Sequence, residues 1–199
     1  MKFRMPTSGE SKALAVVHQQ AFNDFFLTDL GPSFLKTYYK SVIQTKGSIA
    51  VCAVNEEDKI IGFATGCDYA KGYNKRLVIN NLLRFSLQAV KLVFTRPKAI
   101  FRLLKNFEKK SNANDDGSYA ELFSIGVLPE AKGLGIGRKL LEEFEKEAQV
   151  KGCKKITLTT DFYSNDQVVE FYKKNGYHIF YDFYTFPRRR MYKMIKDLV

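Results

Sequence analysis

The chain has 199 residues, a hydrophobic content of 45% and a formal net charge of +11, which is the size and apolar content of one well-cored domain. Its three cysteines, at 52, 67 and 153, are scattered without Cys-x-x-Cys spacing, which argues against a disulfide framework and predicts reduced thiols in a cytoplasmic protein. Two histidines exclude a histidine-rich metal site and disfavour Ser-His-Asp catalysis, so we expect no metal cofactor.

From the N-terminus, the first six residues lack the apolar core of a signal peptide, and no apolar run approaches the roughly 20 residues of a membrane span. Thr7 and Glu10 form a capping-box pattern before a first helix, and a second helix follows Gly31-Pro32. After them we predict strands at 48–54 and 59–67, a strand at 119–127, a helix at 135–150, a strand at 155–160, a helix at 165–175, and strands at 177–184 and 189–195.

This order of elements predicts a mixed α/β fold, with a mixed central sheet and flanking helices. We expect a single domain over residues 1–199, with a helical insert at about 70–117. No internal repeat or low-complexity tract interrupts the pattern.

The insert is the most basic part of the chain. Residues 69–110 hold eleven Lys or Arg against one acid, Glu108, so they carry +10 of the total +11. One helical pattern runs from about 80 to 94, and Pro97 suits the first turn of a second helix. The second helix places Ile100, Leu103, Leu104 and Phe107 on one core-facing stripe. The polar tail at 111–117 is expected to be a mobile loop.

A glycine-rich stretch at 127–138 lies between a predicted strand and a predicted helix. Gly133, Gly135 and Gly137 open the helix, where backbone N–H groups lack intrahelical partners and the helix dipole is positive. Such a turn predicts a ligand with a pyrophosphate. A phosphate-binding loop of nucleotide hydrolases is excluded because Arg138 and Lys139 follow Gly137. A dinucleotide fingerprint fails because Arg138 stands where its third glycine should be.

A third interpretation fits both this loop and a second block. Lys132-x-x-Gly135-x-Gly137 resembles the Gln/Arg-x-x-Gly-x-Gly/Ala motif of the GNAT superfamily of acyl-CoA-dependent N-acetyltransferases, with Lys132 replacing the usual Gln or Arg. The block from Asn165 to Tyr177 resembles that family's Asn-x-x-Ala-x-x-Phe-Tyr…Gly-Phe/Tyr signature, with Val168 replacing the alanine. The resemblance covers roughly residues 121–184, is weak before them and is absent for 69–116.

The resemblance implies the GNAT fold and acetyl-CoA as cosubstrate, with no metal. It implies that a splayed central strand offers main-chain groups to the pantetheine arm, while the side chains of that strand are expected in the core. It implies that the loop N–H groups hold the pyrophosphate, close to glycines without a Cβ. The cofactor-binding residues expected on this basis are Ile125, Gly126, Val127, Lys132, Gly133, Leu134, Gly135, Ile136, Gly137, Arg138, Asn165 and Tyr172.

Two residues are candidates for proton transfer. Glu121 occupies the position where many family members place a general base, and a strand-end carboxylate paired with a nearby cation is the alternative. Tyr172 is expected to protonate the leaving thiolate, and a core aromatic beside Phe171 is the alternative. Asn165 opens the same helix, so it is expected to cap that helix, to contact the cofactor, or both.

The sequence specifies the amine that accepts the acetyl group less closely than it specifies the cosubstrate. We expect a primary amine of a small molecule, with a nucleotide-linked amino sugar as the leading hypothesis, because a cationic insert suits an anionic acceptor. Phe25, Phe26, Asp24 and Asp29 belong to the acceptor wall by resemblance. The alternatives are a protein or peptide N-acetyltransferase, a non-catalytic acyl-CoA-binding module, and a peripheral membrane-binding protein.

The insert itself has three interpretations. It is a packed helical pair with a solvated cationic face, a lid over the acceptor pocket, or a surface that adsorbs to an anionic membrane. No nucleic-acid partner is expected, because no recognisable reading module is present. The oligomeric state stays open, with a homodimer among the options.

Overall fold

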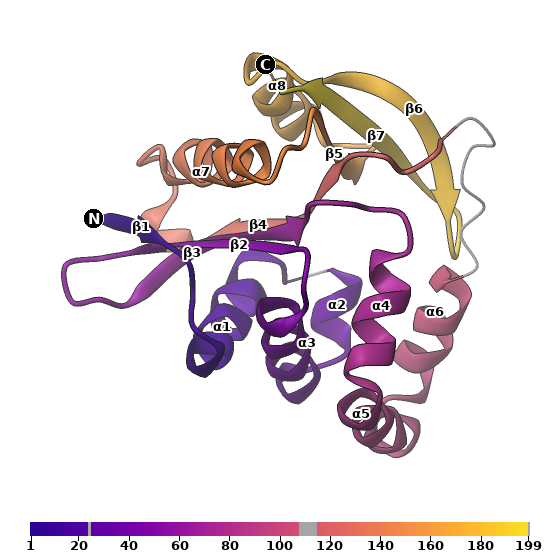
Figure 1. Cartoon of the computed structure of the whole chain (residues 1–199). Helices are drawn as coiled ribbons and strands as arrows, with labels where there is room; N and C mark the ends of the chain where they lie inside the picture. The colour runs from indigo at the N-terminus through magenta and orange to yellow at the C-terminus, as the bar shows by residue number, and fades with distance from the viewer. Residues whose placement is uncertain (24, 108–114, 199) are drawn as a thin grey trace.

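The computed structural model describes residues 1–23, 25–107 and 115–198. Within them, seven strands form one sheet in the order β1-β2-β3-β4-β5-β7-β6 (Figure 1), and every neighbouring pair is antiparallel except β4 and β5. The predicted mixed α/β fold is confirmed. The strands are β1 (Lys2–Arg4), β2 (Ser48–Val54), β3 (Ile60–Cys67), β4 (Ala120–Val127), β5 (Lys155–Asp161), β6 (His178–Thr185) and β7 (Arg189–Asp197).

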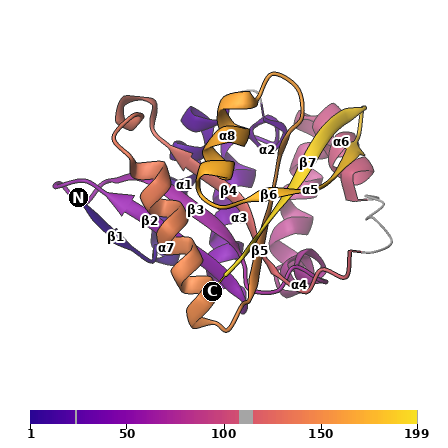
Figure 2. The same cartoon turned by 90° about the horizontal axis from the view of Figure 1, so that it is seen from above.

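Helices cover both faces of the sheet. On one face lie α7 (Ile136–Val150) and α8 (Asp166–Lys174), while α1 to α6 lie on the other (Figures 1 and 2). Two short 3-10 turns, at Ser8–Glu10 and Pro129–Ala131, precede α1 and α7. The helices of the second face are α1 (Ser11–Ala21), α2 (Phe26–Asp29), α3 (Pro32–Gln44), α4 (Tyr73–Asn80), α5 (Leu82–Thr95) and α6 (Pro97–Phe107).

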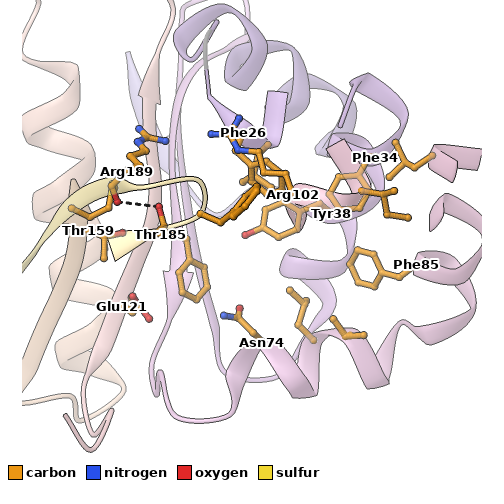
Figure 3. Close-up of a pocket in the computed structure, with 18 of the residues that line it drawn as sticks. Phe26, Phe34, Tyr38, Asn74, Phe85, Arg102, Glu121, Thr159, Thr185 and Arg189 are labelled. Atoms are coloured by element: carbon orange, nitrogen blue, oxygen red, sulfur yellow. Dashed lines mark hydrogen bonds between the residues drawn. The ribbon is translucent and has the colours of Figure 1, made fainter. Parts of the chain in front are cut away.

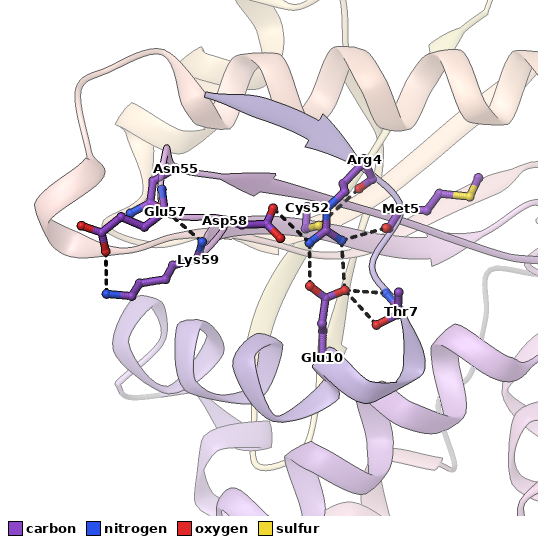
Figure 4. A network of polar contacts seen from close by, with 9 residues as sticks. All are labelled: Arg4, Met5, Thr7, Glu10, Cys52, Asn55, Glu57, Asp58 and Lys59. Carbon is purple, nitrogen blue, oxygen red and sulfur yellow. Dashed lines mark hydrogen bonds and ion pairs between the residues drawn. The ribbon is translucent and has the colours of Figure 1, made fainter.

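The capping pattern at the N-terminus forms as predicted and fixes β1 to the start of α1 (Figure 4). Glu10 accepts hydrogen bonds from the backbone N–H of Thr7 at 2.7 Å and from its hydroxyl at 3.0 Å. Arg4 holds the same carboxylate in a bidentate pair at 2.6 and 3.0 Å. The Arg4 guanidinium lowers the pKa of Glu10 to about 2, so this pair is ionised over the physiological range.

Each face of the sheet has its own core. On the α7 side, Leu140, Leu141 and Phe144 alternate at helical spacing and pack on the buried strand residues. On the α1 side, Leu14 and Leu35 pack with strand residues of β2 and β3. The same side buries a polar pair, in which His18 Nδ1 lies 2.6 Å from the Tyr39 hydroxyl.

The insert differs from its predicted pattern. The helix predicted from about 80 to 94 forms as α5, but an additional, unpredicted helix, α4, precedes it, and the two meet at Asn81 with a bend of 87°. The Asn81 amide stabilises the break because Nδ2 donates to Leu77 O at 3.0 Å and to Thr45 Oγ1 at 3.3 Å. No single helix in the described residues is long and apolar enough to cross a membrane, although α4 and α5 together pass by length and composition.

The third insert helix begins at Pro97 as predicted. Within the core-facing stripe predicted for this helix, Ile100 packs beside the buried Leu92. The structure describes the backbone of Leu103, Leu104 and Phe107 but not their side chains. The predicted loop at 111–117 lies outside them up to residue 114.

A bulge in β4 determines which of its side chains face the α7 side of the sheet and which face the α1–α6 side. The register with β3 shifts between Thr65 and Gly66, so Phe123 has no partner and the strand gains one residue. Gly66 permits this, because a Cβ there would lie 2.0 Å from Glu121 O. Ahead of the bulge Leu122 packs with the α7 core, and beyond it Ile125 does the same. Glu121 and Phe123 therefore point toward the α1–α6 side.

Candidate active site

The two central parallel strands separate after three residues. Residues 120–122 of β4 pair with 156–158 of β5, and no further pairing joins the two strands in the described residues. Both strands continue, β4 to Val127 and β5 to Asp161. The main-chain groups of β4 on this edge therefore face an opening in the middle of the sheet, which is where the family resemblance implies a splayed strand.

The glycine-rich loop runs from this opening into α7. Gly133 and Gly135 adopt φ of +82° and +73°, a left-handed conformation that favours glycine. No acceptor within the described part of the chain takes the backbone N–H groups of residues 133–138. Six consecutive donors at the positive end of a 15-residue helix make a site for phosphate oxygens.

The glycines in this region serve different purposes. A Cβ on Gly133 or Gly135 would meet nothing within 4 Å, so their backbone conformation and the open space above them account for glycine there. A Cβ on Gly126 would lie 2.9 Å from Phe22 Cε2, so Gly126 permits the close approach of α1 rather than the bulge. The side chains of Ile125 and Val127 pack against the core, as expected.

Other loop side chains lie at the surface. Lys132, Leu134 and Arg138 are exposed, whereas Ile136 is buried under the first turn of α7. Arg138 Nε donates to Glu142 at 3.1 Å. The loop therefore offers two cations beside its row of N–H groups.

Tyr172 lies on α8, on the face that carries the loop. Its ring packs at 5.7 Å from that of Tyr177 and at 5.2 Å from that of Phe171. Burial raises the pKa of its hydroxyl, which keeps it protonated. Within the described residues the hydroxyl has no hydrogen-bond partner, yet it is not one of the fully enclosed unpaired atoms. The side chain is thus a core aromatic with a free proton donor at its tip.

Asn165 does not cap α8 with its side chain, which corrects one of the two roles expected for it. Its Nδ2 donates backward instead, to Thr160 Oγ1 at 2.6 Å and to Asp161 O at 3.1 Å. The carbonyl of Asn165 accepts from the backbone N–H groups of Val168 and Val169 in the first turn of α8. The amide therefore fixes the end of β5 against the start of α8.

Glu121 faces the other side of the opening. Lys193 on β7 donates to its Oε1 at 2.6 Å, and both side chains are largely buried. Lys193 also lies 4.9 Å from the centroid of the Tyr119 ring. Sequence reasoning missed Lys193, because no spacing signal links two residues that lie 72 positions apart.

A cavity of about 610 Å³ opens beside Glu121 (Figure 3). Helices α2 to α6 supply most of its wall, and β4, β5 and the β6–β7 hairpin close the rest. Among the lining residues that the structure describes, Glu121 is the only acid and two arginines are the only cations. The apolar lining residues are Phe26, Leu27, Phe34, Tyr38, Leu77, Val78, Phe85, Ala89, Leu92, Ile100, Leu122, Phe123, Phe186 and Met191.

Both cavity arginines already have carboxylate partners. Arg102 lies 3.3 Å from Asp29 Oδ2 and 5.3 Å from the Phe26 ring centroid. Arg189 pairs with Asp161. Of the acceptor-wall residues expected from the sequence, Phe26 lines the cavity, whereas Phe25 is partly exposed under Arg189. Asp24 lies outside the described residues.

Comparison with known sequences gives one family. A family model described as Acetyltransferase (GNAT) family matches residues 17–177 of the chain. An IAA acetyltransferase from Azospirillum brasilense is 37% identical over 62 residues, which are 31% of this chain and 40% of that protein. The match to this relative therefore spans less than half of its length.

Comparison with solved structures gives the same fold. The ribosomal-protein-S18-alanine N-acetyltransferase from Escherichia coli has a TM-score of 0.61 at 17% identity, over 99% of this chain and 93% of that chain. An aminoglycoside 6'-N-acetyltransferase complexed with coenzyme A has a TM-score of 0.61 at 16% identity, over 100% of this chain and 98% of that chain. At these identities the likeness concerns the fold.

Proposed function

Because this chain belongs to the GNAT acetyltransferase family, we propose that it transfers the acetyl group of acetyl-CoA to a primary amine on a small molecule with an apolar body. One observation carries the proposal. In the described residues, the opening between β4 and β5 has the loop of six unpaired N–H groups on one side and a cavity lined by one carboxylate on the other. A cosubstrate with a pyrophosphate and an acceptor with an amine can therefore meet through the sheet.

Different residues of the chain serve different steps of acyl transfer. Acetyl-CoA supplies the thioester. The N–H groups of residues 133–138 hold the pyrophosphate, and the unpaired edge of β4 orients the pantetheine arm and donates to the thioester carbonyl. Glu121 takes the proton that the amine must lose, directly or through water. Tyr172 donates its hydroxyl proton to the departing thiolate.

The ion pair with Lys193 leaves one carboxylate oxygen of Glu121 available to a substrate. The ion pair holds the carboxylate in one orientation at the cavity wall, and Oε2 has no donor within the described residues. A substrate ammonium or a water molecule can use this oxygen. The base role expected for Glu121 and the ion-paired alternative therefore coexist, because the pair occupies only one of the two oxygens.

The cavity lining supports an acceptor with an apolar body. Rings and aliphatic side chains form most of the wall, and such a surface favours apolar groups over phosphates. The two cavity arginines are engaged by Asp29 and Asp161, so a phosphate-bearing acceptor would have to displace carboxylates. The nucleotide-linked amino sugar, suggested by the charge of the insert, is thus the less supported of the two acceptors.

A thiol-release assay tests the proposal. Purified protein with acetyl-CoA is offered four acceptor classes, namely arylalkyl amines, aminoglycosides, nucleotide-linked amino sugars and peptide N-termini. We expect release of CoA thiol with the arylalkyl amines and weaker turnover with the other classes. Preferred turnover of nucleotide-linked amino sugars or of peptides would replace the acceptor class and keep the enzyme class. Acetyl-CoA binding without turnover of any acceptor would favour the non-catalytic acyl-CoA-binding alternative.

A further inference from the structure

Helix α5 is apolar on two opposite faces. Its inner residues, among them Phe85 and Leu92, line the cavity. On its outer face Leu83, Leu87, Val90 and Phe94 recur at i, i+4, i+7 and i+11, which aligns them on one ridge. Their exposed fractions are 76%, 64%, 61% and 83%. We call these four residues the outer stripe.

The outer stripe is part of a larger exposed apolar surface. Leu82 and Val93 lie beside it on α5, and Ile79 at the end of α4 is also exposed. In Figure 1, α5 forms the edge of the molecule opposite α7 and α8, so it lies far from the glycine-rich loop that opens α7. Contiguous apolar surface of this kind on a folded chain marks a binding face.

Cations border the outer stripe. Arg84 and Lys91 each follow a stripe residue by one position, so they point about 100° around the helix from it. Lys75 on α4 and Lys98 on α6 are exposed on the neighbouring helices. Residues 69–107 contain no Asp or Glu at all. The surface thus combines an apolar ridge with positive charges, and the sequence of the insert up to residue 107 supplies no acid to neutralise them.

We propose that the outer face of α5 adsorbs to an anionic phospholipid surface. The outer stripe enters the boundary between headgroups and acyl chains, and the flanking cations contact lipid phosphates. A second copy of the chain is a poorer partner, because pairing two outer stripes would bring two inserts of +10 face to face. An electrically neutral bilayer would leave the cations without partners.

Vesicle co-sedimentation tests this surface without using catalysis. The full chain is mixed with vesicles of phosphatidylcholine alone or of phosphatidylcholine with phosphatidylglycerol, at low and at high salt. We expect binding to the anionic vesicles, with little binding to phosphatidylcholine and loss at high salt. The double substitution Leu87→Ser with Phe94→Ser should weaken binding by about tenfold or more, because two exposed anchors are lost.

Matched variants separate the surface from general effects. Val150→Ser removes an equally exposed apolar residue from the end of α7, and Lys12→Gln removes an exposed cation from α1. Both should bind as the unmodified chain does, whereas Lys91→Gln should bind more weakly. Circular dichroism and thermal unfolding confirm that each variant is folded.

Three results would overturn the proposal. The first is no binding of the unmodified chain to anionic vesicles. The second is equal binding by the folded Leu87→Ser, Phe94→Ser variant. The third is a dimer in light scattering that this double substitution dissociates, which would assign the stripe to a second copy of the chain.

Discussion

Lys193 Nζ lies 2.6 Å from Glu121 Oε1, and this ion pair reaches across strand β5, which separates β7 from β4 in the sheet. The pair fixes the one carboxylate that lines the cavity within the described part of the chain. The proposed base is thereby held in one orientation, so it should lose little entropy when an amine arrives, which would favour proton transfer at this position.

Replacement of Glu121 tests the base. Glu121→Gln should lower kcat by about 10²-fold or more, with acetyl-CoA affinity unchanged because the loop of residues 133–138 is untouched. The control is Glu145→Gln, since Glu145 forms a similar pair with Lys196 at 2.7 Å but does not line the cavity. Steady-state kinetics and calorimetry provide the measurements. Equal loss of kcat in both variants would attribute the effect to lost ion pairing.

Replacement of Tyr172 tests the proposed general acid, and Tyr177, a neighbouring buried tyrosine, provides the control. Tyr172→Phe should lower kcat by about tenfold or more and leave thermal stability almost unchanged, because its hydroxyl makes no hydrogen bond within the described residues. Tyr177→Phe should do the reverse, because its hydroxyl donates to Glu145 at 2.9 Å. We expect that variant to lose about 1–2 kcal/mol of unfolding free energy and to keep its kcat. If Tyr172→Phe turned over at the full rate, the assignment of the acid would be wrong.

Ala89 tests where the acceptor binds. Ala89 lines the cavity from the inner face of α5, so Ala89→Leu should fill space and raise the KM for the amine by about tenfold. The KM for acetyl-CoA should stay the same. Val90→Leu, one residue further along and facing outward, serves as the control. An unchanged KM for the amine in Ala89→Leu would place the acceptor elsewhere.

The buried His18 predicts how stability depends on pH. Burial lowers the pKa of its imidazole to about 4, below the ordinary value of about 6.5 in an unfolded chain. The unfolded state therefore binds the extra proton first, so stability is complete above pH 6.5 and is lost as the pH falls toward 4. The loss amounts to about 3 kcal/mol.

Denaturant unfolding at several pH values measures this effect. His18→Gln should flatten the decline between pH 6.5 and pH 4, whereas His178→Gln, at an exposed position on β6, should leave it unchanged. A decline of the same size in His18→Gln would assign the pH dependence to other titrating groups; Glu10 would act at lower pH, because its pair with Arg4 lowers its pKa to about 2.

Local patterns predicted most of the regular elements, because amphipathic periodicity and glycine positions act over a few residues. The strand at 48–54 was predicted with the bounds that it has, and the helix predicted at 135–150 starts one residue later. The break at Asn81 was missed, since it depends on a hydrogen bond to Thr45, 36 positions away. The short elements β1, α2 and α4 were also missed.

The candidate site divides in the same way. The loop around Gly135 follows from sequence alone, because a glycine turn before a helix creates its own N–H donors. Sequence alone cannot predict the ion pair between Glu121 and Lys193, nor the cavity beside it. Both are formed by segments that only the folded sheet brings together. The bulge at Phe123 is a further case, since the register shift arises where Leu122 pairs with Gly66 on another strand.

Binding of acetyl-CoA to the loop is the central claim, and two glycines at opposite ends of α7 offer a direct test. Gly135 and Gly152 have φ of +73° and +79°, and a Cβ on either would meet nothing within 4 Å. Gly135→Leu and Gly152→Leu therefore impose similar backbone strain. Only a side chain at position 135 would project beside the free N–H groups of residues 133–138.

Calorimetric titration of both variants and the unmodified chain with acetyl-CoA is the measurement that decides. We expect micromolar binding for the unmodified chain and for Gly152→Leu, and a Kd at least about tenfold higher for Gly135→Leu. No binding by the folded, unmodified chain, or equal affinity in all three proteins, would contradict it.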